Sequence, residues 1–582
     1  MFHPITAILA LIPLVQSTAT TRDWRALNAS LQYRLQAVTP IALPCFSTRD
    51  GRPSLPQPQA CSDIQDHYTN AQYRVDNFAS YVWAQAEVCN SEFSQQCLLD
   101  PTDPHNTAAY TNVSCNQGAL PSYYVEVETA KDVTAAFRFA STTGTTISIK
   151  NSGHDYIARS SGPGSLALWT RKLQSLTYHD AFVPTGCRAQ VGRAISTGAG
   201  VNFDQVYTFA HQNNVTFLGG SGPTVGASGG WAMTGGHGIL SRAYGLGIDR
   251  ILEFEVVTPD GKRRIANSCQ NEDLFWALRG GGGSTFGVVL SSTHRVEPAM
   301  PVSVASISIP SNSPANISDG FLNLVLNSTL QWANEGWGGY QGGTVSVVAT
   351  PLLSLAEAQS SMGELARFAK AHGGSAVIES LDSFYEMYTK YILPAPPVAD
   401  MNFNHNWMIP SRFFATADGR QKLQAHLNWM TSVGLTPGFL ATTPYLYSGQ
   451  GGPDSKVKAY SYGPVSSTSS TSAWRKSAAI LTTKTGWAFN APIEDRKKLA
   501  RTLREASDRA RKLAPDGGSY ANEAHPWVNN WQEAFWGDNY AKLSLLKWKW
   551  DPWGLLGCWH CVGSEMGGPS DVVGGRCLGR LI

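Results

Sequence analysis

The sequence has little charge and no long apolar run. Only 15% of its 582 residues are Asp, Glu, Lys or Arg, against about 25% in ordinary soluble proteins. The net charge of +2 gives no reason to expect nucleic acid or an anionic membrane surface as a partner. No stretch of about 20 apolar residues is present, so we expect no membrane-spanning helix. With 42% hydrophobic residues the chain is long enough for two or more globular domains.

The first residues and the cysteines indicate export. A short apolar run, Ile5 to Val15, precedes small residues and predicts a signal peptide over residues 1–19. Ten cysteines, an even number, predict disulfides in an oxidising compartment. We expect local bridges among the five cysteines before residue 120, and a secreted protein. Acceptor sequons predict N-linked glycans at Asn28, Asn112, Asn214, Asn316 and Asn327.

Cys558 and Cys561 have the spacing of half a zinc site. A second Cys/His pair with comparable spacing is missing from the sequence. In an oxidising compartment the pair favours a disulfide, and we predict no metal.

A strand followed by a sharp turn presents His154. The pattern predicts a strand over Tyr123–Glu128, a helix from Thr129 to Gly144, and a second strand over Thr145–Lys150. A backbone rich in Gly and Ser follows, which approaches a phosphate or a flavin closely and directs N–H groups at it. The predicted cofactor-binding residues here are Lys150, Asn151, Ser152, Gly153, His154 and Asp155.

The most glycine-dense part of the chain is residues 219–230, hereafter the glycine-rich segment. It follows a predicted strand (190–197), helix (202–213) and strand (215–218). A flexible linker is the alternative interpretation, but apolar residues are interspersed and ordered strands flank it. We therefore predict backbone contacts with a pyrophosphate. The predicted cofactor-binding residues are Gly222, Pro223, Thr224, Val225, Gly226, Gly229, Gly230, Gly235 and Gly236.

The middle of the chain has a different character. Residues 250–296 predict a hairpin turning at Asp260-Gly261, a short helix over 271–279 and a strand over 286–296. From about residue 301 to 490 longer helices, such as Ser354–His372, mix with strands such as 343–349. This unit is predicted to be a separate α+β domain. After Ala500 tryptophans return.

These segments, in this order, resemble the berberine-bridge-enzyme branch of the vanillyl-alcohol-oxidase superfamily. The resemblance rests on the loop around His154, on Thr224-Val225-Gly226, on residues 273–288, and on Tyr520-Ala521-Asn522-Glu523. It implies an α+β fold with a two-subdomain, PCMH-type FAD-binding domain and an antiparallel sheet that covers the flavin. The implied division is an N-terminal extension (20–120), a FAD-binding domain (121–300 with 491–565), a substrate domain (301–490) and a tail (566–582).

The family pattern also implies how the cofactor is held. The histidine that matches His154 is bonded to the 8α-methyl group of FAD, and many relatives add a cysteine immediately before Pro-Thr-Val-Gly. Gly222 occupies that place here. We therefore expect FAD with a single covalent link, through His154.

The resemblance predicts a flavin-dependent oxidase that takes a hydride from an alcohol or a secondary metabolite and is reoxidised by O₂ to H₂O₂. A valine at the place of Val225 accompanies oxygen reactivity in relatives. Tyr520 and His237 are the candidate catalytic residues, and Asn522 is predicted to contact the cofactor. Tyr385 and Tyr388 could also line the substrate face, but packing in a helix core is the favoured interpretation of both. A carbohydrate oxidase and a non-catalytic flavin-binding glycoprotein remain alternatives.

Overall fold

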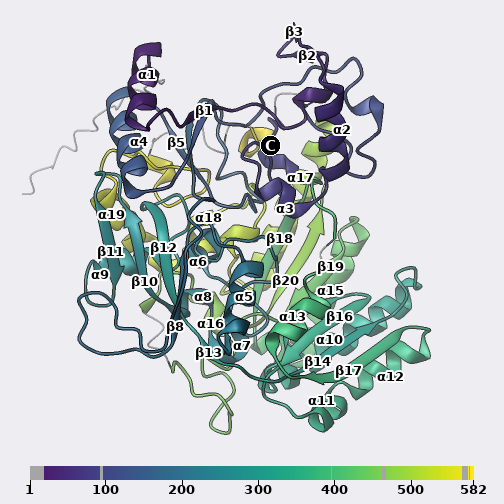
Figure 1. Ribbon diagram of the computed structural model, residues 1–582. Coiled ribbons are helices and arrows are strands. Elements are labelled where there is room, and N and C mark those ends of the chain that lie inside the picture. Colours follow the sequence, from purple (N-terminus) through teal and green to yellow (C-terminus); the bar gives the residue numbers. More distant parts are fainter. Residues whose placement is uncertain (1–18, 92–95, 395, 462–466, 567–574, 576) are drawn as a thin grey trace, which may run out of the picture.

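The computed structural model describes residues 19–91, 96–394, 396–461, 467–566, 575 and 577–582. The predicted signal peptide therefore lies outside the described residues except for its last position. Three larger β-sheets carry the architecture. Figure 1 shows the five-stranded sheet at the left and the seven-stranded sheet at the lower right.

The first sheet has the order β1-β4-β6-β5, with β4, β6 and β5 parallel and β1 antiparallel. Helix α4 connects β4 to β5; its Thr129–Asp132 capping box and the left-handed Gly144 at its end explain both limits. The predicted strand–helix–strand unit is confirmed. The elements are α1 (Thr21–Ser30), β1 (Leu35–Ala37), β4 (Tyr123–Glu126), α4 (Ala130–Thr143), β5 (Ile147–Lys150) and β6 (Leu166–Trp169).

The second sheet is antiparallel throughout, in the order β11-β10-β12-β8-β7. Gly261, with a φ of 75°, turns the predicted hairpin between β10 and β11. Strands β9 and β13 form a separate antiparallel pair in the same stretch of chain. The elements of this stretch are β7 (Leu176–His179), β8 (Ala194–Gly198), α5 (Phe203–Gln212), β9 (Val215–Thr216), α6 (Gly230–Thr234), α7 (Ser241–Tyr244), α8 (Gly247–Arg250), β10 (Ile251–Val257), β11 (Arg263–Asn267), α9 (Glu272–Leu278), β12 (Val288–Arg295) and β13 (Glu297–Pro298).

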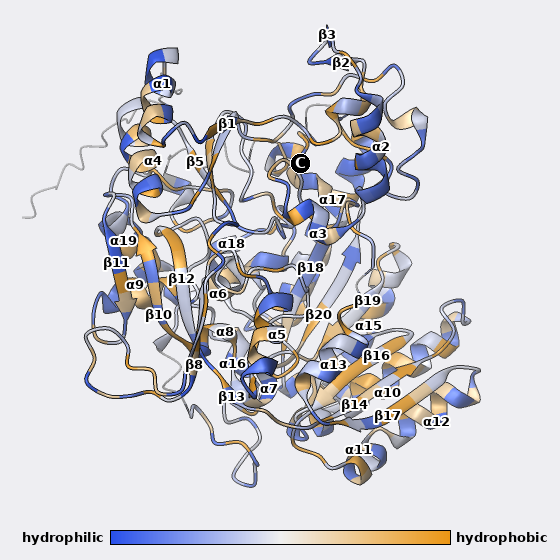
Figure 2. Ribbon diagram, viewed as in Figure 1, coloured by the Kyte–Doolittle hydropathy of each residue, from blue (hydrophilic) through white to orange (hydrophobic). Residues whose placement is uncertain are grey.

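The third sheet is the large antiparallel one, in the order β17-β14-β16-β15-β19-β20-β18. Its strands are β14 (Val302–Ser308), β15 (Gly338–Gly342), β16 (Val345–Thr350), β17 (Ser375–Leu381), β18 (Phe403–Pro410), β19 (Pro437–Leu440) and β20 (Ser477–Thr485). Figure 2 shows apolar residues along β14 and β16. Helices α11 and α12 pack on β14 and β17, and α10 packs on β15 and β20.

The helices around this sheet include α10 (Ala315–Asn334), α11 (Leu355–Ser361), α12 (Gly363–Ala371), α13 (Phe384–Tyr391), α14 (Arg412–Ala415), α15 (Ala417–Ser432), α16 (Ala473–Lys476) and α17 (Ile493–Leu513). The single helix predicted over Ser354–His372 is wrong. It is broken at Met362, and the weak helix former Gly363 starts the second piece. Helix α17 packs on β18, and Trp407 of β18 donates to the Ala514 carbonyl oxygen just past the end of α17.

Five disulfides pair all ten cysteines. Cys45–Cys61 and Cys97–Cys115 are local, as predicted, within an extension that holds β2 (Thr48–Arg49), β3 (Arg52–Pro53), α2 (Pro58–His67) and α3 (Ala71–Val75). The prediction is wrong for the remaining early cysteine, Cys89. It pairs with Cys577, 488 positions away, because the end of the chain folds back onto the extension.

The other two disulfides are Cys187–Cys269 and Cys558–Cys561. The second of these uses the two thiols that the zinc interpretation would have needed. This full set of disulfides fits an oxidising, extracellular or secretory environment. Within the described ranges, no helix has the length and apolar character needed to cross a membrane.

Candidate functional site

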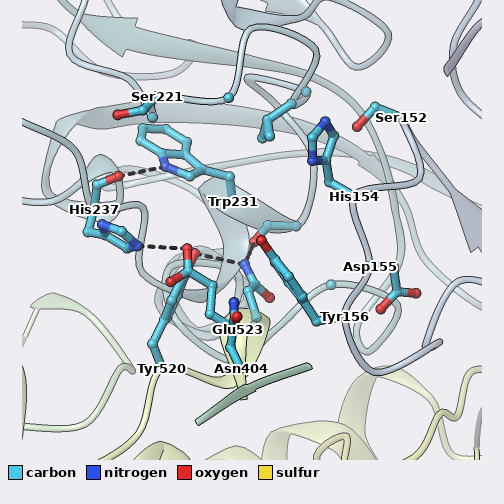
Figure 3. Close-up of a pocket in the computed structure, with 18 of the residues that line it drawn as sticks. Ser152, His154, Asp155, Tyr156, Ser221, Trp231, His237, Asn404, Tyr520 and Glu523 are labelled. Atoms are coloured by element: carbon cyan, nitrogen blue, oxygen red, sulfur yellow. Dashed lines mark hydrogen bonds and ion pairs between the residues drawn. The ribbon is translucent and has the colours of Figure 1, made fainter. Parts of the chain in front are cut away.

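A cavity of about 570 Å³ lies between the two loops predicted to bind the cofactor, around His154 and around Gly222, and the large sheet. This volume is typical of ligand pockets. One wall comes from residues 151–160, hereafter the histidine loop, and from the glycine-rich segment; the other comes from β15, β18, β19 and β20. The short 3₁₀ turn Ala521–Glu523 contributes a third side. Figure 3 shows His154 on one side of this space and His237 on the other.

Most of the predicted site residues meet here. Those that line the cavity are Asn151, Ser152, Gly153, His154, Asp155, Gly222, Val225, Gly226, Gly229, Gly230, His237, Tyr520 and Asn522. Tyr385 and Tyr388 do not line it: Tyr388 donates to Asp204, and Tyr385 stacks on His211. Packing against α5 explains both tyrosines.

The histidine loop is fixed by a glycine turn and by its own hydrogen bonds. Gly153 has a φ of 87°, and a Cβ there would lie 2.9 Å from Lys150 Cε, so the sharp turn needs glycine. The Asp155 carboxylate accepts from the Ser160 amide at 2.6 Å and from the Ser160 hydroxyl at 2.5 Å. Asp155 therefore closes the loop rather than reaching across the cavity. Its neighbour His154 is left to face the space.

His154 has one polar partner among the described residues. Its Nε2 lies 2.7 Å from the Thr224 hydroxyl oxygen. Burial lowers the pKa of His154 to about 4, so the imidazole is neutral at physiological pH. A Cβ on Gly222 would lie 3.6 Å from His154 Cε1 and 2.9 Å from Val225 Cγ2. Gly222 therefore sits beside the histidine, where the family's second attachment residue is expected.

Several other glycines let backbone come close to Asn151. A Cβ on Gly226 would overlap the Asn151 side chain, and one on Gly229 would lie 3.0 Å from its Cγ. The Asn151 amide nitrogen donates to the Ala199 carbonyl oxygen. Its Oδ1 is buried and has no hydrogen-bond partner within the described part of the chain. An acceptor in this position is suited to a bound group that donates to it.

A second unsatisfied group belongs to Arg159, which the sequence analysis missed. One guanidinium nitrogen, Nη2, donates to Asn522 Oδ1 at 2.9 Å, while Nη1 is buried without a partner among the described residues. Asn522 in turn donates to the Gly230 carbonyl oxygen at 2.9 Å and to the Tyr520 hydroxyl oxygen at 2.8 Å. The unpaired Nη1 of Arg159 can donate to a ligand and the unpaired Oδ1 of Asn151 can accept from one, as in a polar ligand site.

A carboxylate and an imidazole pair on the opposite side of the cavity. Glu523 Oε1 lies 2.9 Å from His237 Nε2. The Glu523 side chain is 25% exposed and His237 only 6%, so the carboxylate is the member open to the cavity. Glu523 was also missed, although it follows Asn522 directly. A carboxylate next to a predicted cofactor contact was the signal that could have found it.

Tyr520 is poorly placed to act as a base. Burial, reinforced by the negative charge of Glu523, raises its pKa well above the usual range, and its hydroxyl oxygen accepts from Asn522. Its ring meets the His237 ring edge to face, with centroids 5.1 Å apart. Tyr520 therefore forms a wall of the cavity beside the Glu523–His237 pair.

Five of the predicted cofactor contacts lie behind the cavity wall. Gly235 packs under the Tyr520 ring, and Gly236 abuts Gly247. The Pro223 carbonyl oxygen accepts from the Asp204 amide, and Thr224 faces His154. Lys150 points the other way, and its ammonium donates to the carbonyl oxygens of Asn77, Phe78 and Ser80 at 3.1, 2.7 and 2.6 Å.

Comparison with known proteins gives this geometry a family. A model described as "FAD binding domain" matches residues 121–267, and one described as "Berberine and berberine like" matches residues 519–556. An FAD-linked oxidoreductase of Aspergillus flavipes is 60% identical over 606 residues, covering 99% of this chain and 98% of that protein. This chain belongs to the berberine-bridge-enzyme-like FAD-linked oxidoreductases. A VAO-type flavoprotein oxidase of Thermothelomyces thermophilus is 31% identical over 94% of the chain and 91% of its own length.

The solved structures agree with the FAD-linked fold. A VAO-type flavoprotein from Myceliophthora thermophila has a TM-score of 0.80 at 27% identity, covering 95% of this chain and 97% of its own. A chitooligosaccharide oxidase structure, at 20% identity and a TM-score of 0.59, shares the fold over 83% of this chain and 97% of its own. The α+β, PCMH-type fold predicted from the sequence is confirmed.

FAD fits the residues of this cavity. The glycines of the loops leave a cradle that side chains would fill, and Asn151 Oδ1 and Arg159 Nη1 provide a buried acceptor and a buried cation without protein partners among the described residues. Residues Gly222, Gly226, Gly229 and Gly230 would hold the cofactor along one wall, with His154 and Asn522 beside it.

Replacing Lys150 tests whether this side chain stabilises the fold or binds the cofactor. Lys150→Met removes the donor from three carbonyl groups, so we expect a loss of about 2–4 kcal/mol in the free energy of unfolding. Flavin content per folded molecule should stay at the wild-type value because Lys150 does not line the cavity. Thermal unfolding and the ratio of flavin to protein absorbance measure the two quantities. A variant of normal stability that loses its flavin would return Lys150 to the cofactor site.

Proposed function

We propose that this protein is a secreted flavin-dependent oxidase that removes a hydride from an alcohol carbon of a small molecule or secondary metabolite and transfers the electrons to O₂, giving H₂O₂. The observation that carries the proposal is one cavity with His154 at one side and a carboxylate–imidazole pair at the other. Bound FAD supplies the hydride acceptor and the route of the electrons to oxygen.

The chain's own residues have separate tasks in this proposal. His154 holds the cofactor covalently, by a single link because Gly222 offers no thiol. Arg159 and Asn522 contribute a cation and an amide beside Gly230. Strands β15 and β19 line the side of the cavity that faces the large sheet.

Glu523 is the residue to which we assign the base. Its carboxylate accepts the hydroxyl proton of the substrate, and His237 orients it from behind through the 2.9 Å contact. Tyr520 and Tyr340 flank this position, and the Tyr340 hydroxyl donates to Ser221 at 2.5 Å. Both candidate residues from the sequence, Tyr520 and His237, thus support the carboxylate rather than replace it.

The substrate is proposed as a class only. A sugar remains the second candidate, since a chitooligosaccharide oxidase shares the fold and polar side chains of Gln341, Asn404 and Thr482 line the sheet side of the cavity. A panel of secondary alcohols, polycyclic alcohols and oligosaccharides, read by peroxide release, separates the two.

Of the proposed glycan sites, Asn112, Asn214, Asn316 and Asn327 are exposed, whereas the Asn28 side-chain oxygen accepts from the Leu35 amide.

Covalent attachment of the flavin through His154 can be tested directly. The wild-type protein, precipitated with acid, should keep its flavin in the pellet, and the flavin peptide should contain His154. His154→Ala should bind flavin that acid releases completely. Flavin found on any other residue, or free in the wild-type supernatant, would contradict the single link.

Glu523→Gln tests the base. The substitution keeps size and hydrogen bonding but removes the proton acceptor, so kcat/KM on any alcohol that the panel identifies should fall about 10²–10³-fold. KM should change little, and the pH profile should lose the limb that reports deprotonation of the base. Stopped-flow flavin reduction measures this step alone. If kcat/KM falls equally in Asn404→Ala and Glu523→Gln and the pH profile is unchanged, Glu523 only shapes the cavity and is not the base.

Val225→Leu tests the oxygen step. Val225 lines the cavity next to Gly222, whose missing side chain leaves space beside it, and the added methylene would narrow that space. We expect reoxidation by O₂ to slow far more than reduction by substrate, each timed by stopped-flow absorbance. Equal slowing of both half-reactions would mean that the substitution disturbs cofactor binding instead.

A further inference from the structure

The two ring nitrogens of His154 have different surroundings. Nε2 lies 2.7 Å from the Thr224 hydroxyl oxygen, whereas Nδ1 has no hydrogen-bond partner within the described part of the chain. Thr224 is 6% exposed, and His154 is the only hydrogen-bond partner found for its hydroxyl among the described residues. The pair is therefore shielded, and its geometry distinguishes one nitrogen from the other.

This contact favours one tautomer of the neutral imidazole. With the proton on Nε2, the N–H donates to Thr224 Oγ1 and Nδ1 keeps its lone pair. With the proton on Nδ1 instead, Nε2 would accept from the Thr224 hydroxyl, and the ring would present to the cavity an N–H that has no acceptor within the described part of the chain. The nitrogen with the lone pair is then the one not occupied by Thr224.

Rigid elements fix Thr224 in this place. The carbonyl oxygens on either side of it, those of Pro223 and Val225, accept from the Asp204 and Phe203 amides at 3.0 Å, in the first turn of α5. The Val225 amide also donates to the Gly222 carbonyl oxygen at 3.0 Å. A hydroxyl tied to a helix start in this way holds its position relative to the histidine loop.

We propose that Thr224 is the positioning residue for covalent flavin attachment, accepting Nε2–H of His154 so that Nδ1 forms the bond to the 8α carbon. The inference rests on the proposed covalent link to His154. A bond forms between Nδ1 and the 8α carbon, one C–H bond of the 8α-methyl group breaks with its proton passing to solvent, and the Nε2 proton of the imidazole passes to solvent through the Thr224 hydroxyl. The two electrons left by these steps reduce the flavin, and O₂ takes them to give H₂O₂.

The test compares covalent and total flavin in the full chain. Thr224→Val is nearly isosteric but lacks the hydroxyl, Thr224→Ser keeps it, and Thr436→Val changes a cavity-lining threonine on the sheet side as the control. Each purified protein is incubated with FAD in air and precipitated with acid at intervals. Thr224→Val should bind as much flavin as wild type yet attach it about tenfold more slowly. The Ser variant and the control should match wild type.

The outcomes separate the inference from the proposed function. Wild type without acid-stable flavin would refute the covalent link itself. Wild type with acid-stable flavin and a Thr224→Val variant of equal attachment rate would refute the role of Thr224. If Thr224→Val loses total flavin, the rate of covalent attachment per molecule of bound flavin decides: a slower rate than in wild type supports the inference, and the wild-type rate refutes it. A bond at Nε2 in the NMR spectrum of the wild-type flavin peptide would also overturn it.

Discussion

One amide side chain joins the three segments that form the cavity. Asn522, from the C-terminal part of the chain, donates to Gly230 at the end of the glycine-rich segment and accepts from Arg159 at the end of the histidine loop. These partners lie 292 and 363 positions away in sequence. Asn406 of β18 adds a matching tie, since its Oδ1 accepts from the Tyr520 amide at 2.6 Å. These contacts hold the segment that carries Tyr520 and Glu523 at the cavity, across from His154.

The arrangement explains how a chain with so little charge can hold a charged cofactor. Apart from tyrosines, the ionisable side chains that line the cavity are few: Arg159, Lys484, Asp155, Glu523, His154 and His237. Buried polar groups interact strongly because the local dielectric is low, and each therefore needs a defined partner. The unpartnered atoms of Asn151 and Arg159 are consistent with a site shaped for a ligand.

Local features of the site were predictable from the sequence. The helix between Thr129 and Gly144, the strand before His154 and the hairpin at Gly261 depend on residues within a few positions of one another, and each was predicted. Features that depend on distant contacts were not. The Cys89–Cys577 bridge needs the fold-back of the C-terminus, and the side-chain direction of Lys150 depends on carbonyl groups of the N-terminal extension. Glu523 became a candidate only when His237 was seen beside it.

The most direct test of this account is a crystal structure of the flavin-loaded protein. We expect continuous electron density between the His154 ring and the 8α carbon of FAD, no connection at Gly222, and the reactive edge of the flavin ring turned toward Glu523. Density for a flavin that is unattached to His154, or whose reactive edge faces away from Glu523, would contradict the site as we have assigned it.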